Sequence, residues 1–525
     1  MESACLRHTD IPHTSRLFAD FQYHFDRVKN YYRYYPGDPE SYAQAAAAVE
    51  YPDDRRAGLV AALRKRNGDS PLLDRLARPG TVAVVTGQQV GLFSGPAYTI
   101  YKALTAMRLA DSLNQRGIAA VPIFWVATED HDFAEIDHTF VFDSSHGHVR
   151  LSAKENVPAQ TPVGMVQLTA PPLDELRTCL AGMPFADEIL AMVESAYRPG
   201  ETFGCAFQHL LQQILGKDKL LFVDPLDRAI RELAAPVLRK ALADAPALSE
   251  KLLERNQELE TAGYHAQVHV EKQTSLVFLL DGKRRLALKR SNGDYVAKDR
   301  RFSTAELSDL ADHLSPNALL RPVVQDFILP TVAYVGGPAE LAYIAQSRVI
   351  YDDLLGRMPV VLSRAGFTLL DARTHKLMQR YGATMPEFFH GEDALREKIA
   401  ASLVPQNVGA EFEQVRSAID AHLERLQTDV LAFDPTLQAA LKKSRGKVVF
   451  QLSKMERKTA REALRRNQRA GEESAFMANL IFPEKHLQER YYSILPFLAQ
   501  HGPQLVDTLA QFVNLDCPDH KVLVV

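Results

Sequence analysis

The alternation of apolar and polar positions predicts a strand–helix–strand unit between residues 81 and 126. Residues 82–85 form a short apolar run rich in valine, which is typical of a buried strand. A glycine-containing loop follows, then a helix from Pro96 to about Arg116, and a second apolar run covers residues 118–126. Two strands joined in this way by a helix lie parallel and are buried.

The same pattern returns in the second half of the chain. The predicted strand, turn, helix and second strand cover residues 331–335, 336–338, 339–355 and 359–362. The triplet Gly-Pro-Ala stands at the same point of both units, at residues 95–97 and 337–339. We therefore expect an α/β fold in which the two units form the halves of one doubly wound parallel sheet, with a cleft between them.

These patterns divide the chain into five segments. The segments are an N-terminal helical segment (1–79), the first half of the core (80–145), a connecting insertion (146–316), the second half of the core (317–375) and a helical coiled-coil domain (376–525). The N-terminal segment is expected to pack on the core through an apolar stripe between Phe18 and Tyr35, and the insertion contains a predicted β-hairpin at residues 273–289.

Apolar residues at spacings of three and four between positions 412 and 459 predict two long antiparallel helices. Such a coiled-coil arm could join two copies of the chain. The helix surface is basic at residues 442–447 and 456–469, so RNA binding is the alternative. Because solvated helix faces are commonly this charged, we expect no nucleic-acid partner.

Composition narrows the class of protein. The chain has 525 residues, of which 46% are hydrophobic and 24% charged, and its formal net charge is −4. These values are ordinary for a soluble globular protein and argue against a nucleic-acid-binding surface over the whole molecule. The four cysteines form no C-x-x-C pair, and no signal core or membrane-spanning run is present. We expect a cytoplasmic protein without a membrane partner.

Polar residues follow the first predicted strand. The loop Thr86-Gly87-Gln88-Gln89 contains neither a P-loop nor a dinucleotide-binding glycine motif. Its backbone N–H groups and the start of the next helix would suit a phosphate or a carboxylate, and the glutamine side chains can donate and accept hydrogen bonds. A glycine turn required only for packing is the alternative, and we favour ligand contact.

An acidic cluster follows the second predicted strand, in the consecutive residues Glu129, Asp130, His131 and Asp132. Such crowding of like charges is unfavourable unless a cation, a donor or a change of protonation relieves it. His131 beside carboxylates is a candidate general base for an amine nucleophile, and the carboxylates could hold Mg²⁺. A solvated acidic loop is the alternative, and we favour the functional interpretation.

The second unit also carries polar residues near its strands. Arg321 and Gln325 precede the first of these strands, Glu340 lies on the helix, and Arg364 follows the second strand. Arg321 and Arg364 are candidate clamps for an anionic group.

Four long motifs occur in order over nearly the whole chain. They are TGQQVGLFSGPAYTIYK at 86–102, FWVATEDHDFAEIDH at 124–138, PNALLRPVVQDFILPTVAYVGGPAELAYIAQ at 316–346 and IFPEKHLQER at 481–490. Together they resemble the BshC family, the cysteine ligases of bacillithiol biosynthesis.

The resemblance implies a Rossmann-like core, similar to nucleotidyltransferases and class I synthetases, and a coiled coil that forms a homodimer. The implied reaction joins the carboxyl group of L-cysteine to the amine of glucosaminyl-malate, and ATP is implied because a free carboxylate needs activation. By analogy, residues 86–89, Tyr98 and residues 130–132 would line the substrate cleft. The glutamines would orient malate or phosphate oxygens, and Asp130 or His131 would deprotonate the amine.

Two other classes of function stay open. The chain could be a different nucleotide-activating transferase that uses the same cleft on another amine acceptor. It could also be a non-catalytic scaffold whose coiled coil recruits partners. ATP turnover that depends on another acceptor would indicate the first, and ligand binding without turnover would indicate the second.

Overall fold

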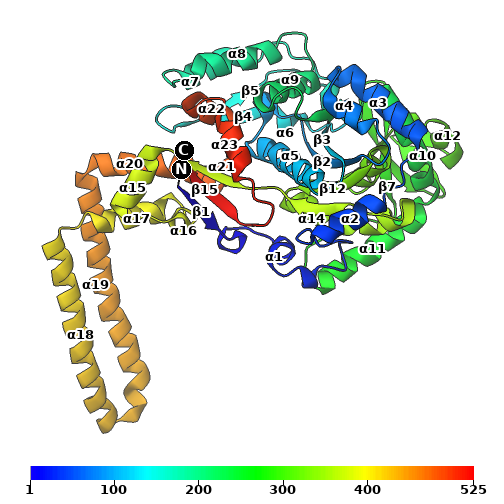
Figure 1. Cartoon of the computed structure of the whole chain (residues 1–525). Coiled ribbons are helices and arrows are strands. Elements are labelled where there is room, and N and C mark those ends of the chain that lie inside the picture. The colour runs from blue at the N-terminus through cyan, green and yellow to red at the C-terminus, as the bar shows by residue number, and fades with distance from the viewer. Residues whose placement is uncertain (1, 299) are drawn as a thin grey trace.

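A body built around a β-sheet and a projecting helical arm make up the molecule (Figure 1). The computed structural model describes residues 2–298 and 300–525. Within these residues, no helix combines the length and the apolar character that crossing a bilayer requires.

A five-stranded parallel sheet forms the centre of the body, in the order β13-β12-β2-β3-β6. Its strands are β2 (Val82–Gln88), β3 (Ala120–Val126), β6 (Leu221–Val223), β12 (Thr331–Gly336) and β13 (Val360–Ser363). Because β2 of the first unit pairs directly with β12 of the second, the prediction of one sheet built from two halves is confirmed.

Alternating side chains of β2 explain why helices cover both faces of the sheet. Ala83 and Val85 belong to one hydrophobic cluster, whereas Val82 and Val84 belong to another. Helix α5 (Tyr98–Gln115) packs into the second cluster and α14 (Pro338–Leu354) into the first. The crossover helices of the two units therefore lie on opposite faces, as in other doubly wound sheets.

The N-terminal segment packs on this core as the apolar stripe predicts. Phe18, Phe21 and Tyr32 are buried, whereas Tyr35 at the end of the stripe is exposed. The segment is not one long helix, however, because the chain leaves the helical conformation at His24 (φ −143°). Its elements are β1 (Ser3–Leu6), α1 (Arg16–Tyr23), α2 (Pro39–Ala47), α3 (Asp53–Asn67) and α4 (Pro71–Leu76).

The insertion between the two units contributes helices, a five-stranded sheet, strand β5 and the edge strand β6. The predicted hairpin is confirmed as β7 (Thr274–Asp281) and β8 (Arg284–Ser291), part of a five-stranded antiparallel sheet. The other strands of that sheet are β9 (Asp294–Ala297), β10 (Arg300–Phe302) and β11 (Leu314–Pro316). A separate two-stranded sheet pairs β4 (His138–Phe142), just before the insertion, with β5 (His148–Ser152). The helices of the insertion are α7 (Leu173–Leu180), α8 (Ala186–Ala196), α9 (Phe203–Leu215), α10 (Arg228–Ala243), α11 (Ala245–Thr261) and α12 (Thr304–Asp309). Helix α6 (Phe133–Ile136) precedes the insertion, and α13 (Arg321–Ile328) follows it in the second unit.

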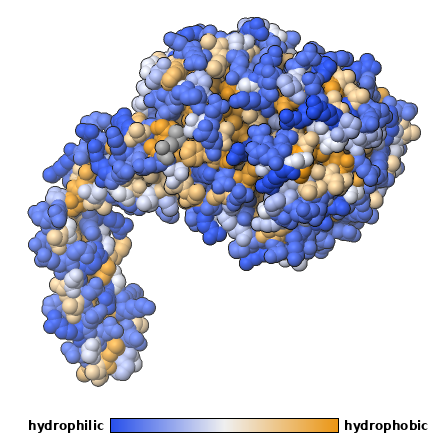
Figure 2. All heavy atoms as spheres, viewed as in Figure 1, coloured by the Kyte–Doolittle hydropathy of each residue, from blue (hydrophilic) through white to orange (hydrophobic). Residues whose placement is uncertain are grey.

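The arm consists of α18 (Gln406–Phe433) and α19 (Gln438–Arg466), which run antiparallel as predicted (Figure 1). Arg416 contacts Glu456, and Arg445 donates to Asp420 at 2.7 Å, which fixes the pairing of the two helices. No residue in 406–433 is buried, and Figure 2 shows apolar surface along the arm.

The chain ends meet in a small sheet at the base of the arm (Figure 1). Strand β15 (His520–Val524) lies between β1 and β14 (Phe367–Leu370), antiparallel to the first and parallel to the second. The neighbouring helices are α15 (Ala372–Tyr381), α16 (Met385–Phe388), α17 (Glu392–Ser402), α20 (Gln468–Ile481), α21 (Gln488–Tyr491), α22 (Leu495–His501) and α23 (Leu505–Phe512).

Candidate active site

A cleft of about 630 Å³ lies at the carboxyl ends of β2 and β12. The chain leaves these neighbouring strands toward opposite faces of the sheet, so the two connections diverge and leave a hollow between them. Ligands of doubly wound sheets bind at this position. Residues 87–89 line the cleft on one side and residues 337–340 on the other.

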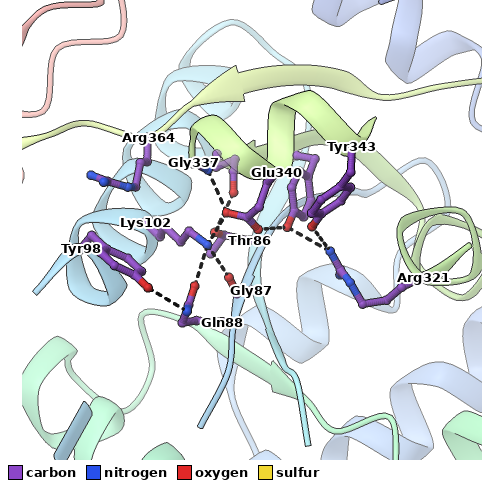
Figure 3. A network of polar contacts seen from close by, with 12 residues as sticks. Thr86, Gly87, Gln88, Tyr98, Lys102, Arg321, Gly337, Glu340, Tyr343 and Arg364 are labelled. Carbon is purple, nitrogen blue, oxygen red and sulfur yellow. Dashed lines mark hydrogen bonds and ion pairs between the residues drawn. The ribbon is translucent and has the colours of Figure 1, made fainter. Parts of the chain in front are cut away.

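A buried ion pair between Lys102 of α5 and Glu340 of α14 lies at the centre of the cleft (Figure 3). The Lys102 Nζ atom also donates to Gly87 O at 2.9 Å and to Gln88 Oε1 at 2.8 Å. Burial alone would raise the pKa of Glu340, but Lys102 and the hydrogen bond from Tyr334 (2.6 Å) lower it. Glu340 is therefore ionised and joins the two halves of the sheet.

Three arginines lie around this pair. We call the group Lys102, Arg321, Arg364 and Arg490 the cationic side of the cleft. Arg321 donates to the Tyr343 hydroxyl at 2.5 Å (Figure 3). Arg364 and Arg490 both lie near the ring of Tyr98, at 5.1 and 5.9 Å from its centroid. Among the described residues, Arg321 and Arg490 have no carboxylate partner within 4.0 Å, so their charge is available to an anion.

The opposite side of the cleft is acidic and is defined by Glu129, Asp130 and His131. Asp130 Oδ2 accepts from Gln89 Nε2 at 2.7 Å, and Asp130 Oδ1 accepts from the backbone N–H of His131 at 2.7 Å. Gln89 also donates to Glu135 at 2.8 Å. The glutamine after β2 therefore orients the carboxylate after β3.

Glu129 has an unusual environment in this group. Its side chain is almost fully buried, and burial raises the pKa of the carboxyl group to about 7, although Arg285 opposes the shift. A carboxyl group with a pKa near neutrality can exchange a proton at physiological pH, which is the property a general base or acid requires.

The insertion supplies Arg285, which the sequence analysis did not assign to the site. Arg285 on β8 donates to Ser315 Oγ at 3.0 Å and to Pro316 O at 2.7 Å, and its guanidinium lies over the ring of Phe278 at 4.0 Å. Its Nη1 is 3.3 Å from His131 Nδ1. The β-hairpin thus closes the acidic side of the cleft.

Most of the predicted site residues come together in this cleft. Those that line it are Gly87, Gln88, Gln89, Tyr98, Asp130, His131, Arg321, Glu340 and Arg364. Three others do not line it. Thr86 is buried in β2 and donates to Val335 O at 2.8 Å, Gln325 is buried beneath Arg321, and Asp132 is exposed beside the cleft.

The glycine loop has a different form from the one expected. Strand β2 continues to Gln88, so residues 86–88 belong to the strand rather than to a loop. A Cβ atom on Gly91 would stand 2.8 Å from Gly95 Cα, and one on Gly87 would stand 2.7 Å from Trp125 O. Close backbone packing therefore explains these glycines without a ligand.

Lys102 and Arg490 are further lining residues that sequence reasoning did not assign. Both lie inside the quoted motifs, at the last residue of the first and the last residue of the fourth. Lys102 is the charged residue on the buried face of an otherwise apolar helix turn, and this was a signal that could have identified it. Arg285 lies outside the motifs and carries no such signal.

Within residues 2–298 and 300–525, no three His, Cys, Asp or Glu side chains are grouped so that they could hold a metal ion by themselves.

Two family models together match nearly the whole chain. The model described as "Bacillithiol biosynthesis BshC, N-terminal Rossmann-like domain" matches residues 1–365, and "Bacillithiol biosynthesis BshC, C-terminal coiled-coil domain" matches residues 367–525. The Rossmann-like core and the C-terminal coiled coil that the resemblance implies are therefore confirmed.

Curated relatives cover the same length. Proteins named "Putative cysteine ligase BshC" from Solibacter usitatus and Koribacter versatilis are 53% and 35% identical, over 100% and 99% of both chains. The protein of that name from Salinibacter ruber is 33% identical over 97% of this chain and 96% of its own. The chain therefore belongs to the BshC family of bacillithiol biosynthesis.

Proposed function

We propose that this protein is a ligase that joins the carboxyl group of L-cysteine to the amine of glucosaminyl-malate by ATP-dependent amide formation. The family supports the reaction class, since the relatives are named as cysteine ligases. In this chain the proposal depends on one observation, the division of a single cleft into a cationic and an acidic side.

An acceptor with carboxylates at one end and an amine at the other suits this division. The malate carboxylates would lie against Arg321 and Arg364, and the amine would lie toward Asp130 and His131. Attack of the amine nitrogen on the activated carbonyl carbon forms the C–N bond and breaks the bond between that carbon and the phosphate oxygen, so AMP or phosphate leaves. The attacking amine also loses a proton. A neutral His131 or an ionised carboxylate of the acidic side would accept that proton.

Bound ATP would activate the carboxyl group of cysteine for attack by the amine. Its phosphates need positive charge, and the guanidinium group of Arg490, which lines the cleft and is not used by the malate carboxylates, meets that need. Mg²⁺ usually binds phosphates together with only one or two protein carboxylates, so a preformed metal cluster is not required. Asp130, which is partly exposed in the cleft, would be its protein ligand.

The test is a mass-spectrometric assay of the purified protein with glucosaminyl-malate, L-cysteine and ATP. We expect the ligated thiol to form, and formation of AMP or ADP tells which phosphate bond of ATP is broken. Asp130→Asn and His131→Ala should each lower the rate by at least about a hundredfold, because the native side chains position the amine or accept its proton.

The neighbouring pair Asp137 and His138 offers matched controls. These side chains contact each other at 2.7 Å but do not line the cleft, so Asp137→Asn and His138→Ala should leave the rate unchanged. Full activity of the Asp130 and His131 variants would contradict the assignment. ATP turnover only with a different acceptor would favour another transferase, and binding without turnover would favour a scaffold.

We also propose that the protein is a cytoplasmic homodimer whose partners are these small molecules. The supporting feature is the arm, which projects from the body and has large apolar side chains on its surface (Figures 1 and 2). A second copy that packs along the arm would cover them.

A further inference from the structure

The segment of residues 488–493 reaches the cleft from the C-terminal domain. The Gln488 side chain accepts from Leu369 N at 2.7 Å and donates to Leu369 O at 2.9 Å, which joins the segment to β14. Ser493 Oγ donates to Phe93 O at 3.1 Å, and Phe93 has a left-handed conformation (φ 51°) that is uncommon for a non-glycine residue. The segment therefore fixes both β14 and the loop before α5.

Within this segment, Glu489 forms a buried ion pair with Arg364. Arg364 Nη1 donates to Glu489 Oε2 at 3.0 Å, and Nη2 donates to Oε1 at 2.6 Å. The side chains are only 6% and 3% exposed, and Glu489 Oε2 also accepts from Phe367 N at 3.0 Å. Two parallel bonds of this kind fix the plane of the guanidinium group.

The remaining donors of Arg364 determine what else it can bind. A guanidinium group has five N–H donors. Two donate to Glu489, and another on Nη1 donates to Ala365 O at 2.9 Å. The donors that remain are the Nε–H and the second Nη2–H, which share one edge of the planar group. The Nε atom lies 3.7 Å from the position that a Cβ on Gly337 would take, and Gly337 lines the cleft.

We propose that Glu489 is a positioning residue, which holds Arg364 so that its free Nε–Nη2 edge binds a carboxylate group of the substrate. The inference rests on the proposed function and adds that the C-terminal domain completes the site. Glu489 lies in the C-terminal family match and Arg364 in the N-terminal one. An arginine already anchored at one edge loses little freedom when it binds a carboxylate at the other.

The intrinsic fluorescence of the protein offers a direct binding measurement. Trp125 is the only tryptophan of the sequence and lines the cleft, so titration with L-malate reports on this site. We expect Glu489→Gln to raise the Kd for L-malate by at least about tenfold, because the amide cannot accept from both guanidinium nitrogens. In the ligase assay, the same variant should raise the KM for glucosaminyl-malate more than it lowers kcat.

Glu473→Gln is the matched control. Glu473 is likewise buried in the C-terminal domain and accepts hydrogen bonds from Arg380, Tyr381 and Arg469, but it does not line the cleft. Its substitution removes a comparable ion pair at the base of the arm. The affinity for L-malate should not change.

Gly337→Ala tests the free edge of Arg364 without breaking the ion pair. The added methyl group would meet Glu340 Oε2 at 3.5 Å and Arg364 Nε at 3.7 Å, which are ordinary contact distances, and the backbone φ of −90° suits alanine. This variant should fold normally. Because its methyl group occupies the space beside Nε, we expect it also to raise the Kd for L-malate by about tenfold.

Several results would overturn the inference. These are an unchanged affinity for L-malate in folded Glu489→Gln or in Gly337→Ala, equal weakening in Glu473→Gln, and no response of the unsubstituted protein to L-malate. If Glu489→Gln does not fold, Gly337→Ala decides. The ligase assay separates the two proposals. If Glu489→Gln forms product with an unchanged KM for glucosaminyl-malate, only the proposed function is retained. If the unsubstituted protein binds L-malate in a way that depends on Glu489 but forms no product, only this inference is retained.

Discussion

At the scale of single residues, Glu129 combines burial with a place in the cleft. The groups that face it are Arg285 on β8, Asp224 after β6, Ser315 on β11 and Arg321 on α13. Burial outweighs the two arginines, so the pKa of the carboxyl group is about 7 and the group is about half protonated at pH 7. Burying a carboxyl group in this way destabilises the fold, which indicates a functional role.

Glu129→Gln should make the stability of the protein less dependent on pH. The folded-state pKa of about 7 lies above the ordinary 4.5, so the folded protein holds this proton more tightly than the unfolded chain. Stability is therefore lost as the pH rises from 4.5 through 7. We expect the variant to be more stable at pH 8 by on the order of 3 kcal/mol, with the difference shrinking toward pH 4.5.

Urea unfolding at pH 5 and pH 8 measures this effect. Glu135→Gln is a suitable control, because Glu135 lies on the same segment and is exposed. If the stabilities of Glu129→Gln and the unsubstituted protein differ equally at the two pH values, Glu129 is ionised throughout and the interpretation is wrong.

At the scale of elements, contacts between the two helices stabilise the arm, but large apolar side chains on it stay exposed to solvent. Ion pairs such as Arg416–Glu456 hold α18 and α19 together. Large apolar side chains nevertheless remain exposed on both helices, namely Val415, Leu426, Phe433, Val448, Phe450 and Met455. Large exposed apolar groups on a projecting arm are typical of a surface that another chain covers.

Leu426→Glu combined with Phe450→Glu should separate the proposed dimer. These side chains are 49% and 54% exposed, so the substitutions should not disturb the fold of the arm, whereas charges buried between two copies are strongly unfavourable. Light scattering should change from twice the chain mass to 58.6 kDa. Ser444→Glu adds a charge at an exposed polar position of α19 and should leave the dimer intact. A monomeric unsubstituted protein at micromolar concentration would contradict the proposal.

At the scale of the whole molecule, β15 joins the two ends of the chain to the body. It is the middle strand of its sheet, and His520 on it contacts Thr368 Oγ1 of β14 at 2.8 Å. Its removal leaves β1 and β14 without a shared partner. The same sheet supports the segment that carries Glu489, so the chain ends and the cleft form one structural unit.

Deletion of residues 520–525 should lower the melting temperature by at least about 5 °C, because it removes a buried strand and its ladder of hydrogen bonds. Replacement of arm residues 417–455 by a short glycine–serine linker should lower it by less than about 2 °C, since few of these residues pack on the body. Circular dichroism melting compares the two. Equal melting of the truncated and full-length chains would show that β15 does not support the body.

The sequence by itself determined the elements whose pattern is local. The four strands of the two units, the hairpin of the insertion and the antiparallel arm are confirmed, because hydrophobic periodicity and turn residues specify each of them within a few tens of residues. The carboxyl ends of adjacent parallel strands meet at one edge, so the candidate residues Gln89, Asp130 and Glu340 could be expected together, and they line one cleft.

Only the tertiary structure decided which distant segments meet. Strands β1 and β15 pair although they lie at opposite ends of the chain, and no local pattern relates one to the other. Lys102, Arg285 and Arg490 line the cleft, whereas Thr86 and Gln325 turn away from it. Local pattern determines whether a side chain is on a strand or a helix, but its neighbours depend on how those elements pack, and that is a property of the whole fold.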